Sequence, residues 1–226
     1  AKPDDLGQLA SAQVIALSRD GSQFAFVTSG DAYIAPVTAP AAGTRLLGGV
    51  VDVDLDASNR LWMVTANGRL WVRDGVRPPQ KVLSVPQDQR VVAISHSPDG
   101  ARVAIVFASD DGQSVRICGV VTTGTSVALG PAIRVEQSLS GALDVAWLDS
   151  LQLLIVGQLG VEQPSVFRLN LQAFQTTPLG GPAGIAQLSA VYGQPPAVLT
   201  NQGMLWILQG TQWQSLREAS AIAYAA

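Results

Sequence analysis

The 226-residue sequence is poor in the residues on which most protein chemistry depends. It has one cysteine, Cys118, one histidine, His96, and only 14% charged residues. A lone cysteine excludes an internal disulfide and a multi-cysteine metal site, and one histidine cannot make a zinc site. No cofactor and no metal are therefore predicted.

Basic residues and long apolar runs are also scarce. The chain has 14 Lys and Arg against 17 Asp and Glu, spread thinly, so there is no basic stripe to neutralise phosphates and nucleic acid is not an expected partner. No apolar run approaches the roughly 18 residues of a membrane span. Residues 1–7 lack the features of a signal peptide, which predicts either a cytosolic protein or a mature fragment.

What the sequence has is apolar residues, 47% of the total, arranged in an internal repeat. Each copy begins with an apolar run that ends in a turn, and a second short run without helical spacing follows it. The five first runs are 14–21, 51–59, 91–100, 143–150 and 185–190. The five second runs are 24–27, 61–64, 103–106, 153–156 and 197–200.

Two more runs complete each copy, after a turn rich in Gly, Asn or Asp. Third runs lie at 32–37, 70–72, 115–117, 166–169 and 204–208, and fourth runs at 44–47, 81–84, 132–135, 175–179 and 213–216. Four strands in a unit of about 45 residues are typical of a propeller blade.

The predicted fold is therefore all-β, a single-domain β-propeller of five four-stranded blades. A twisted sheet that is apolar on both faces needs two neighbours, and a closed ring supplies them. The predicted blades are approximately 14–49, 50–89, 90–141, 142–184 and 185–217. Residues 218–224 are compatible with a short helix but also resemble another first strand, so a sixth, incomplete blade remains an alternative.

His96 is the first candidate for chemistry. It lies beside the turn formed by residues 97–100, and we expect its imidazole to cap that turn rather than to catalyse or bind metal. No Gly-x-Ser-x-Gly motif exists, and Ser95 and Ser97 are too close in sequence to complete a triad. No catalytic residue is predicted.

Four aspartates, Asp52, Asp54, Asp56 and Asp144, fall in predicted first strands, which line the channel of a propeller. The first three are expected to share one strand face. A wet channel or local hydrogen bonding in turns is favoured over bound Ca²⁺. The run at 110–112 predicts a hairpin turn rather than a calcium loop. Paired carboxylates for glycoside cleavage remain open, because blades bring distant residues together.

The tryptophans invite a sugar-binding interpretation, because indole faces stack on sugar rings. They are Trp62, Trp71, Trp147, Trp206 and Trp213. The first four lie inside apolar strands, which favours core packing, whereas Trp213 is more open. Cys118 is expected to be a small buried apolar residue.

Two segments, 119–131 and 180–184, are predicted to be loops at one end of the ring, longer or less usual than hairpins require. Because blade walls are used in packing while loops are free, we expect the domain to bind a protein partner through these loops rather than through its side walls or channel. A merely tolerated insertion remains the alternative for both segments.

Several motifs, in this order, resemble the C-terminal propeller domain of the actinobacterial lipoprotein LpqB family. They are Asp-Leu-Gly-Gln-Leu at 5–9, Ala-Leu-Ser-Arg-Asp-Gly at 16–21 followed by Phe-Ala at 24–25, and Ala-Ile-Ser-His-Ser-Pro-Asp-Gly-Ala-Arg-Val-Ala at 93–104. The Ser-x-Asp-Gly turns alone also occur in TolB-like and WD40-like propellers. The order of the motifs and the N-terminal stretch carry the resemblance.

The resemblance implies a secreted precursor, lipidated on a cysteine absent from this chain, with a GerMN domain ahead of the propeller. It implies a location on the extracytoplasmic face of the cell membrane, attached only through that lipid anchor. The implied partner is the extracellular domain of the MtrB-type sensor histidine kinase of a two-component system. The family supplies no catalytic residues.

Two other functions remain open. A cell-wall glycan-binding module would need exposed tryptophans on one face. A lactonase or sialidase type of hydrolase would need channel ligands or an arginine cluster. The sialidase Asp box is absent, because the glycine of the turn at 18–21 comes one place early.

Overall fold

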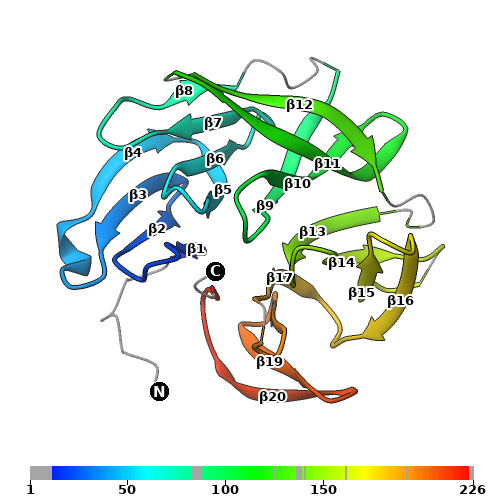
Figure 1. Ribbon diagram of the computed structural model, residues 1–226. Helices are drawn as coiled ribbons and strands as arrows, with labels where there is room; N and C mark the ends of the chain where they lie inside the picture. Colours follow the sequence, from blue (N-terminus) through cyan, green and yellow to red (C-terminus); the bar gives the residue numbers. More distant parts are fainter. Residues whose placement is uncertain are drawn as a thin grey trace.

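A computed structural model describes residues 12–82, 88–124, 126–135, 139, 141–160, 162–191 and 193–223. These residues form twenty strands and a single 3₁₀ turn at Pro40–Ala42. The strands make five four-stranded antiparallel sheets arranged around a central channel, as Figure 1 shows. The predicted five-bladed propeller is confirmed.

The strands of each blade follow one another in chain order from the channel to the rim. Blade 1 contains β1 (Val14–Leu17), β2 (Gln23–Thr28), β3 (Asp31–Pro36) and β4 (Thr44–Gly48). Blade 2 contains β5 (Val50–Leu55), β6 (Leu61–Thr65), β7 (Leu70–Arg73) and β8 (Gln80–Lys81). Blade 3 contains β9 (Arg90–His96), β10 (Arg102–Ser109), β11 (Gly112–Thr123) and β12 (Ser126–Arg134).

The last two blades have the same organisation. Blade 4 contains β13 (Gly141–Trp147), β14 (Gln152–Gln158), β15 (Ser165–Asn170) and β16 (Gln175–Gly180). Blade 5 contains β17 (Ile185–Ser189), β18 (Ala197–Thr200), β19 (Met204–Gln209) and β20 (Gln212–Glu218). The hairpin turn predicted at 110–112 is confirmed, since residues 110 and 111 join β10 to β11, which begins at Gly112.

The Ser-x-Asp-Gly turns have a local cause. In the turn after β9, the Ser97 hydroxyl donates to Asp99, and Asp99 accepts the backbone N–H of Ala101. Gly100 has φ +69°, a conformation that glycine adopts without strain. The sequence motif therefore closes the link between the first and second strands of a blade.

The blades pack face to face through their second strands. Every residue of β6 is buried, and its side chains alternate between two neighbours. Leu61 and Met63 belong to the cluster shared with blade 1, and Trp62 and Val64 to the cluster shared with blade 3. Similar clusters join blade 3 to blade 4 and blade 4 to blade 5.

The loop predicted at 119–131 is wrong, because β11 and β12 continue through it as a long hairpin. Its Val120, Val127 and Leu129 pack against the cluster between blades 2 and 3. Figure 1 shows the hairpin extending across the outer strands of blade 2, where β8 is only two residues long. The uncharged Val- and Thr-rich sequence that suggested a loop is also typical of strands.

The second predicted loop, 180–184, begins on Gly180, the last residue of β16, and leads into β17.

Among the described residues, there is no helix of the length and apolarity that a membrane crossing requires.

The ring is less tightly joined between blade 5 and blade 1. None of the hydrophobic clusters formed by the described residues connects these two blades. The Gln187 side chain of β17 donates to the backbone oxygen of Gln13, just ahead of β1.

Candidate functional site

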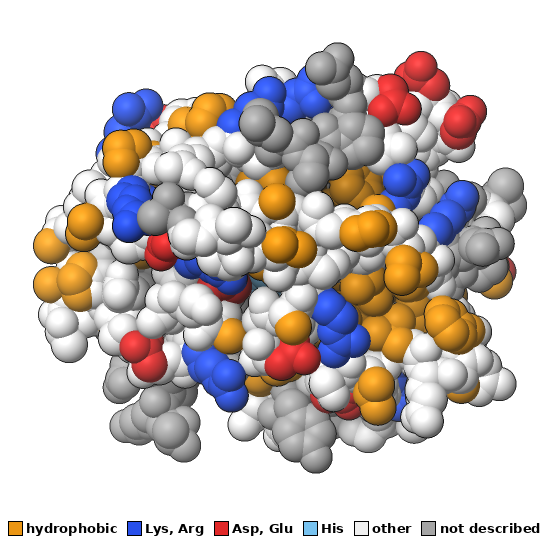
Figure 2. Space-filling view, turned by 45° about the horizontal axis from the view of Figure 1, so that its top comes forward, with side chains coloured by type: hydrophobic (Ala, Val, Ile, Leu, Met, Phe, Trp, Pro, Cys, Tyr) orange, Lys and Arg blue, Asp and Glu red, His pale blue; other side chains and the backbone are white. Residues whose placement is uncertain are grey.

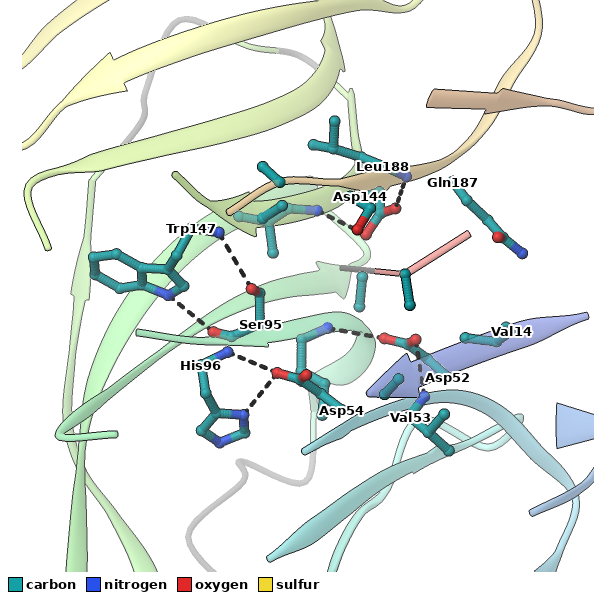
Figure 3. Close-up of a pocket in the computed structure, with 18 of the residues that line it drawn as sticks. Val14, Asp52, Val53, Asp54, Ser95, His96, Asp144, Trp147, Gln187 and Leu188 are labelled. Atoms are coloured by element: carbon teal, nitrogen blue, oxygen red, sulfur yellow. Dashed lines mark hydrogen bonds and ion pairs between the residues drawn. The ribbon is translucent and has the colours of Figure 1, made fainter. Parts of the chain in front are cut away.

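The central channel contains a cavity of about 360 Å³ lined by the first strands of all five blades, β1, β5, β9, β13 and β17. Figure 3 shows carboxylates from two blades, Asp52 and Asp54 of β5 and Asp144 of β13, lying around it. The sequence placed these three aspartates in first strands, and the structure brings them together.

Four of the first strands share a one-residue bulge. In β5, Val50 pairs with Thr65 and Asp52 with Val64, so Val51 is the extra residue. The extra residues in the other three strands are Val92, Leu143 and Ala186. All four line the channel, with Val51 46% and Leu143 39% exposed.

The bulges were missed at the sequence level. The available signal was a pair of adjacent apolar residues that breaks the alternation, such as Val50-Val51 or Val91-Val92. Because the bulges lie near the beginning of these four first strands, they surround the channel mouth beside the links between blades.

Arg19 lies at the opposite end of the channel, in the turn after β1. Its Nη1 donates to the backbone oxygen of Pro98 at 3.1 Å, in the turn after β9. This contact joins blade 1 to blade 3 across that end. The bulged mouth is therefore the end without this arginine bridge.

The carboxylates of Asp52 and Asp144 each connect two blades. Asp52 accepts the N–H of Val53 on its own strand at 2.9 Å and the N–H of Ile94 in blade 3 at 3.0 Å. Asp144 accepts from Val145 at 2.8 Å and from Leu188 in blade 5 at 2.7 Å. Each therefore satisfies a backbone donor on the neighbouring first strand.

Asp54 also connects two blades, and in addition it contacts the side chain of His96. Its Oδ2 accepts the backbone N–H of His96 at 2.7 Å and lies 2.9 Å from His96 Nδ1. The expectation that His96 caps the adjacent turn is wrong, because Ser97 and Asp99 perform that role. The imidazole is buried instead, with its centroid 4.7 Å from that of Trp62.

The junction of blades 3 and 4 uses a hydroxyl and a carbonyl in place of a carboxylate. The backbone N–H of Trp147 donates to Ser95 Oγ at 3.3 Å, and its indole N–H donates to the Ser95 carbonyl at 2.9 Å. Arg102 lies over the same indole ring, 4.9 Å from its centroid.

Asp56 does not share the channel face with Asp52 and Asp54, contrary to the prediction. β5 ends at Leu55, and Asp56 is buried in the following turn, where it accepts the N–H groups of Ser58 and Arg60. Its Oδ2 also accepts Arg60 Nε at 2.7 Å and Trp62 Nε1 at 2.9 Å. The local-acceptor interpretation holds for this residue.

Among the described residues, no serine hydroxyl is hydrogen-bonded to the imidazole of the Asp54–His96 pair. Nε2 of His96 is buried and has no hydrogen-bond partner among the described residues. The neighbouring hydroxyls are engaged, because Ser97 donates to Asp99 and Ser95 accepts from Trp147. A Ser-His-Asp relay needs a serine hydroxyl hydrogen-bonded to the free imidazole nitrogen.

The channel carboxylates are hard to ionise. Burial raises the pKa of Asp144 to about 7, against two hydrogen bonds that lower it. Burial also raises the pKa of Asp52 well above its usual value, and the charge of Asp144 adds to this. Within the described part of the chain, no group of three or more His, Cys, Asp or Glu side chains is placed to hold a metal ion.

The tryptophans pack between blades. Trp62 and Trp147 are buried, and the other three are half-buried against core clusters. Trp213, for which the sequence favoured core packing least, donates its indole N–H to the carbonyl of Leu179 in blade 4 at 3.0 Å. Cys118 is buried, as expected, and burial raises the pKa of its thiol.

Comparison with known families gives one match for this sequence. Residues 55–224 match the family model described as the lipoprotein LpqB beta-propeller domain. No curated protein matches the sequence.

Solved structures show the same fold at low sequence identity. TolB from Acinetobacter baumannii superposes with a TM-score of 0.70 at 14% identity, covering 91% of this chain and 54% of its own. A chain of the nidogen/laminin complex gives 0.70 at 12% identity, covering 91% and 79%. The tricorn protease gives 0.65 at 8% identity, covering 93% and 26%. This chain therefore spans about half of the TolB chain.

We predict that Asp56→Asn lowers the free energy of unfolding by about 3–5 kcal/mol, because it leaves Arg60 buried without its counter-charge. The matched control is Asp31→Asn, which breaks the exposed ion pair with Arg45 and should cost at most about 1 kcal/mol. Urea unfolding of both variants measures the difference. Equal losses would contradict the role given to Asp56.

Stability should also increase on mild acidification. The folded-state pKa of Asp144, about 7, lies above that of an unfolded aspartate, so the folded state holds the proton more tightly. The free energy of unfolding should therefore rise as the pH falls from about 8 to about 5, by at most about 1.4 kcal/mol per pH unit for one proton. Asp144→Asn should reduce this slope, and an unchanged slope would show that other groups cause it.

Proposed function

Because this chain belongs to the LpqB β-propeller domain family, we propose that it is a non-catalytic, extracytoplasmic module that binds another protein through the bulged mouth of its channel. The proposed partner is the extracellular domain of a sensor histidine kinase, whose signalling the bound propeller modulates. The lipoprotein named in the family description supports a location on the outer side of the cell membrane.

The observation that carries the proposal is the ring of bulged aliphatic residues. Val51, Val92, Leu143 and Ala186 come from four different blades and line one cavity, where Val51 and Leu143 remain exposed. A β-bulge redirects a side chain at the cost of a ladder hydrogen bond, and bulges often lie beside functional sites. Exposed apolar side chains held on a rigid scaffold suit a protein interface.

The link at 180–184 belongs to the same end of the ring, because it leads directly into β17 and its bulged Ala186. It is rich in glycine and carries no charge. In this proposal the link forms part of the rim around the apolar mouth and contacts the partner there.

The channel carboxylates hold neighbouring blades together, and this structural role argues against an enzyme. Asp52, Asp54 and Asp144 accept backbone N–H groups across blade junctions, so moving any of them would break the ring contacts. A glycan-binding role is not favoured either. None of the five tryptophans presents a fully exposed ring for stacking.

The test is the double substitution Val51→Ser and Leu143→Ser, which removes apolar surface from the mouth. We expect it to weaken binding to the purified extracellular domain of the sensor kinase by about ten-fold or more, a change of about 1.4 kcal/mol. Isothermal titration calorimetry measures the dissociation constant.

The matched control is Val76→Ser with Phe174→Ser, two side chains that are 94% and 69% exposed and do not line the channel. It should leave affinity unchanged. Equal effects of the two double variants, or no binding by the unmodified chain, would overturn the proposal.

A further inference from the structure

A groove of about 470 Å³ lies outside the channel, between the outer strand of blade 1 and the outer strands of blade 2. Blade 1 contributes Leu47 and Gly48 of β4 to its lining, and blade 2 contributes Arg69, Trp71 and Lys81. The described residues that line it therefore include two cations and no carboxylate. Figure 2 shows Lys and Arg scattered over one face of the molecule with Asp and Glu among them, so such a lining is a local feature.

The backbone of the link between the blades and of one turn forms this groove. Gly49 follows β4 with φ +70°, and a Cβ added there would have no atom within 4 Å. The carbonyl of Gly49 accepts the N–H of Ala66 at 2.7 Å, which ties the link to the turn between β6 and β7. Thr65 Oγ1 accepts the N–H of Arg69 at 3.2 Å and holds that turn. The groove is therefore open on the side of blade 1 and fixed on the side of blade 2.

Sheet register places the two cations around an indole ring. Lys81 of β8 pairs with Trp71 of β7, so their side chains are cross-strand neighbours on one face. Arg69 is two residues ahead of Trp71, which puts it on the same face by strand alternation. Trp71 is half-buried against the cluster shared by blades 1 and 2, whereas Lys81 is exposed. The cations thus flank a flat apolar surface.

Both cations are available to a ligand. Among the described residues, neither Arg69 nor Lys81 takes part in an ion pair. Asp31 lies beside the groove, because it pairs with Gly48 in the sheet of blade 1. Its two oxygens are bound by Arg45 at 2.7 and 2.9 Å, so its charge is already matched.

The groove opens at the same end of the ring as the bulged mouth. Gly49 belongs to its lining, and the bulged Val51 comes two residues later. Between them, the N–H of Val50 donates to the carbonyl of Gly30 at 2.8 Å, in the turn between β2 and β3. A protein that covers the exposed side chain of Val51 therefore also reaches the groove.

A carboxylate on a peptide fits this lining. A guanidinium binds a carboxylate through two parallel hydrogen bonds, and an ammonium adds a second point of positive charge. The net charge of the chain is −3, which opposes contact with an extended anionic surface such as a membrane or a nucleic acid. Trp71 offers apolar area to the side chain next to the carboxylate.

We propose that the groove between blades 1 and 2 binds an acidic segment of the protein partner, with a carboxylate held between Arg69 and Lys81 and an adjoining apolar side chain on Trp71. The partner in this inference is the protein of the proposed function, on which the inference rests. The mouth supplies apolar contact, and the groove beside it selects for negative charge.

An NMR titration with the peptide acetyl-Leu-Glu-Leu-Glu-Leu-amide tests the groove without the kinase domain. We expect shifts of the Trp71 indole N–H and of the amides of Gly49 and Ala66, and none with the Leu-Gln-Leu-Gln-Leu analogue. The double variant Arg69→Gln with Lys81→Gln should bind the acidic peptide about five-fold more weakly or less.

The matched control is Arg168→Gln with Arg217→Gln, which removes the same charge from two exposed arginines of blades 4 and 5 that do not line the groove. It should leave peptide affinity unchanged, and the amide spectra of both variants report whether they fold. Equal affinities of the two double variants, or no shifts at these groups with the unmodified chain, would overturn the proposal.

The extracellular domain of the sensor kinase is then titrated with the same proteins. We expect the groove variant alone to lose affinity, and added salt to weaken the unmodified chain more than this variant. Equal affinity of both charge variants would overturn the proposal while leaving the mouth intact. If the domain does not bind the unmodified chain, the proposed function fails and the peptide titration alone decides the groove. Phosphatidylglycerol vesicles that bind through these two cations, without peptide shifts, would assign the groove to lipid and overturn the proposal.

Discussion

The structure depends on one constraint, the need to satisfy backbone N–H groups on the innermost strands. Each first strand is an edge of its sheet, with its second side toward the channel, and an unpaired buried N–H costs free energy comparable to a lost hydrogen bond. Asp52, Asp54 and Asp144 meet this need by accepting N–H groups from the next blade. The same contacts set the spacing of neighbouring blades around the channel.

This use of carboxylates shapes what the channel can do. Because burial raises the pKa of Asp52 and Asp144, the channel carries less negative charge near neutral pH than its residues suggest. The oxygens that would hold a cation already accept backbone hydrogen bonds. The apolar bulged residues at the mouth are then the groups free to meet a partner, which is why the proposed function rests on them.

The sequence predicted the blades because strand alternation and Gly-containing turns are local signals that recur five times. It also placed Asp52, Asp54 and Asp144 at the channel. The errors concern features set by neighbouring blades. His96 contacts Asp54 from another blade, and the 119–131 hairpin extends because it packs over blade 2. Asp56 was wrongly predicted to lie on the channel face, because its contact with Arg60 holds it in the turn after β5.

The most direct test of this account is amide hydrogen exchange by NMR at Ile94, His96 and Leu188 in the unmodified chain. These three amides donate only to carboxylates across blade junctions in the contacts described here. The account predicts protection equal to that of amides in the buried second strands β6 and β10. Rapid exchange at all three, with β6 and β10 protected, would contradict the claim that the carboxylates hold the blades together.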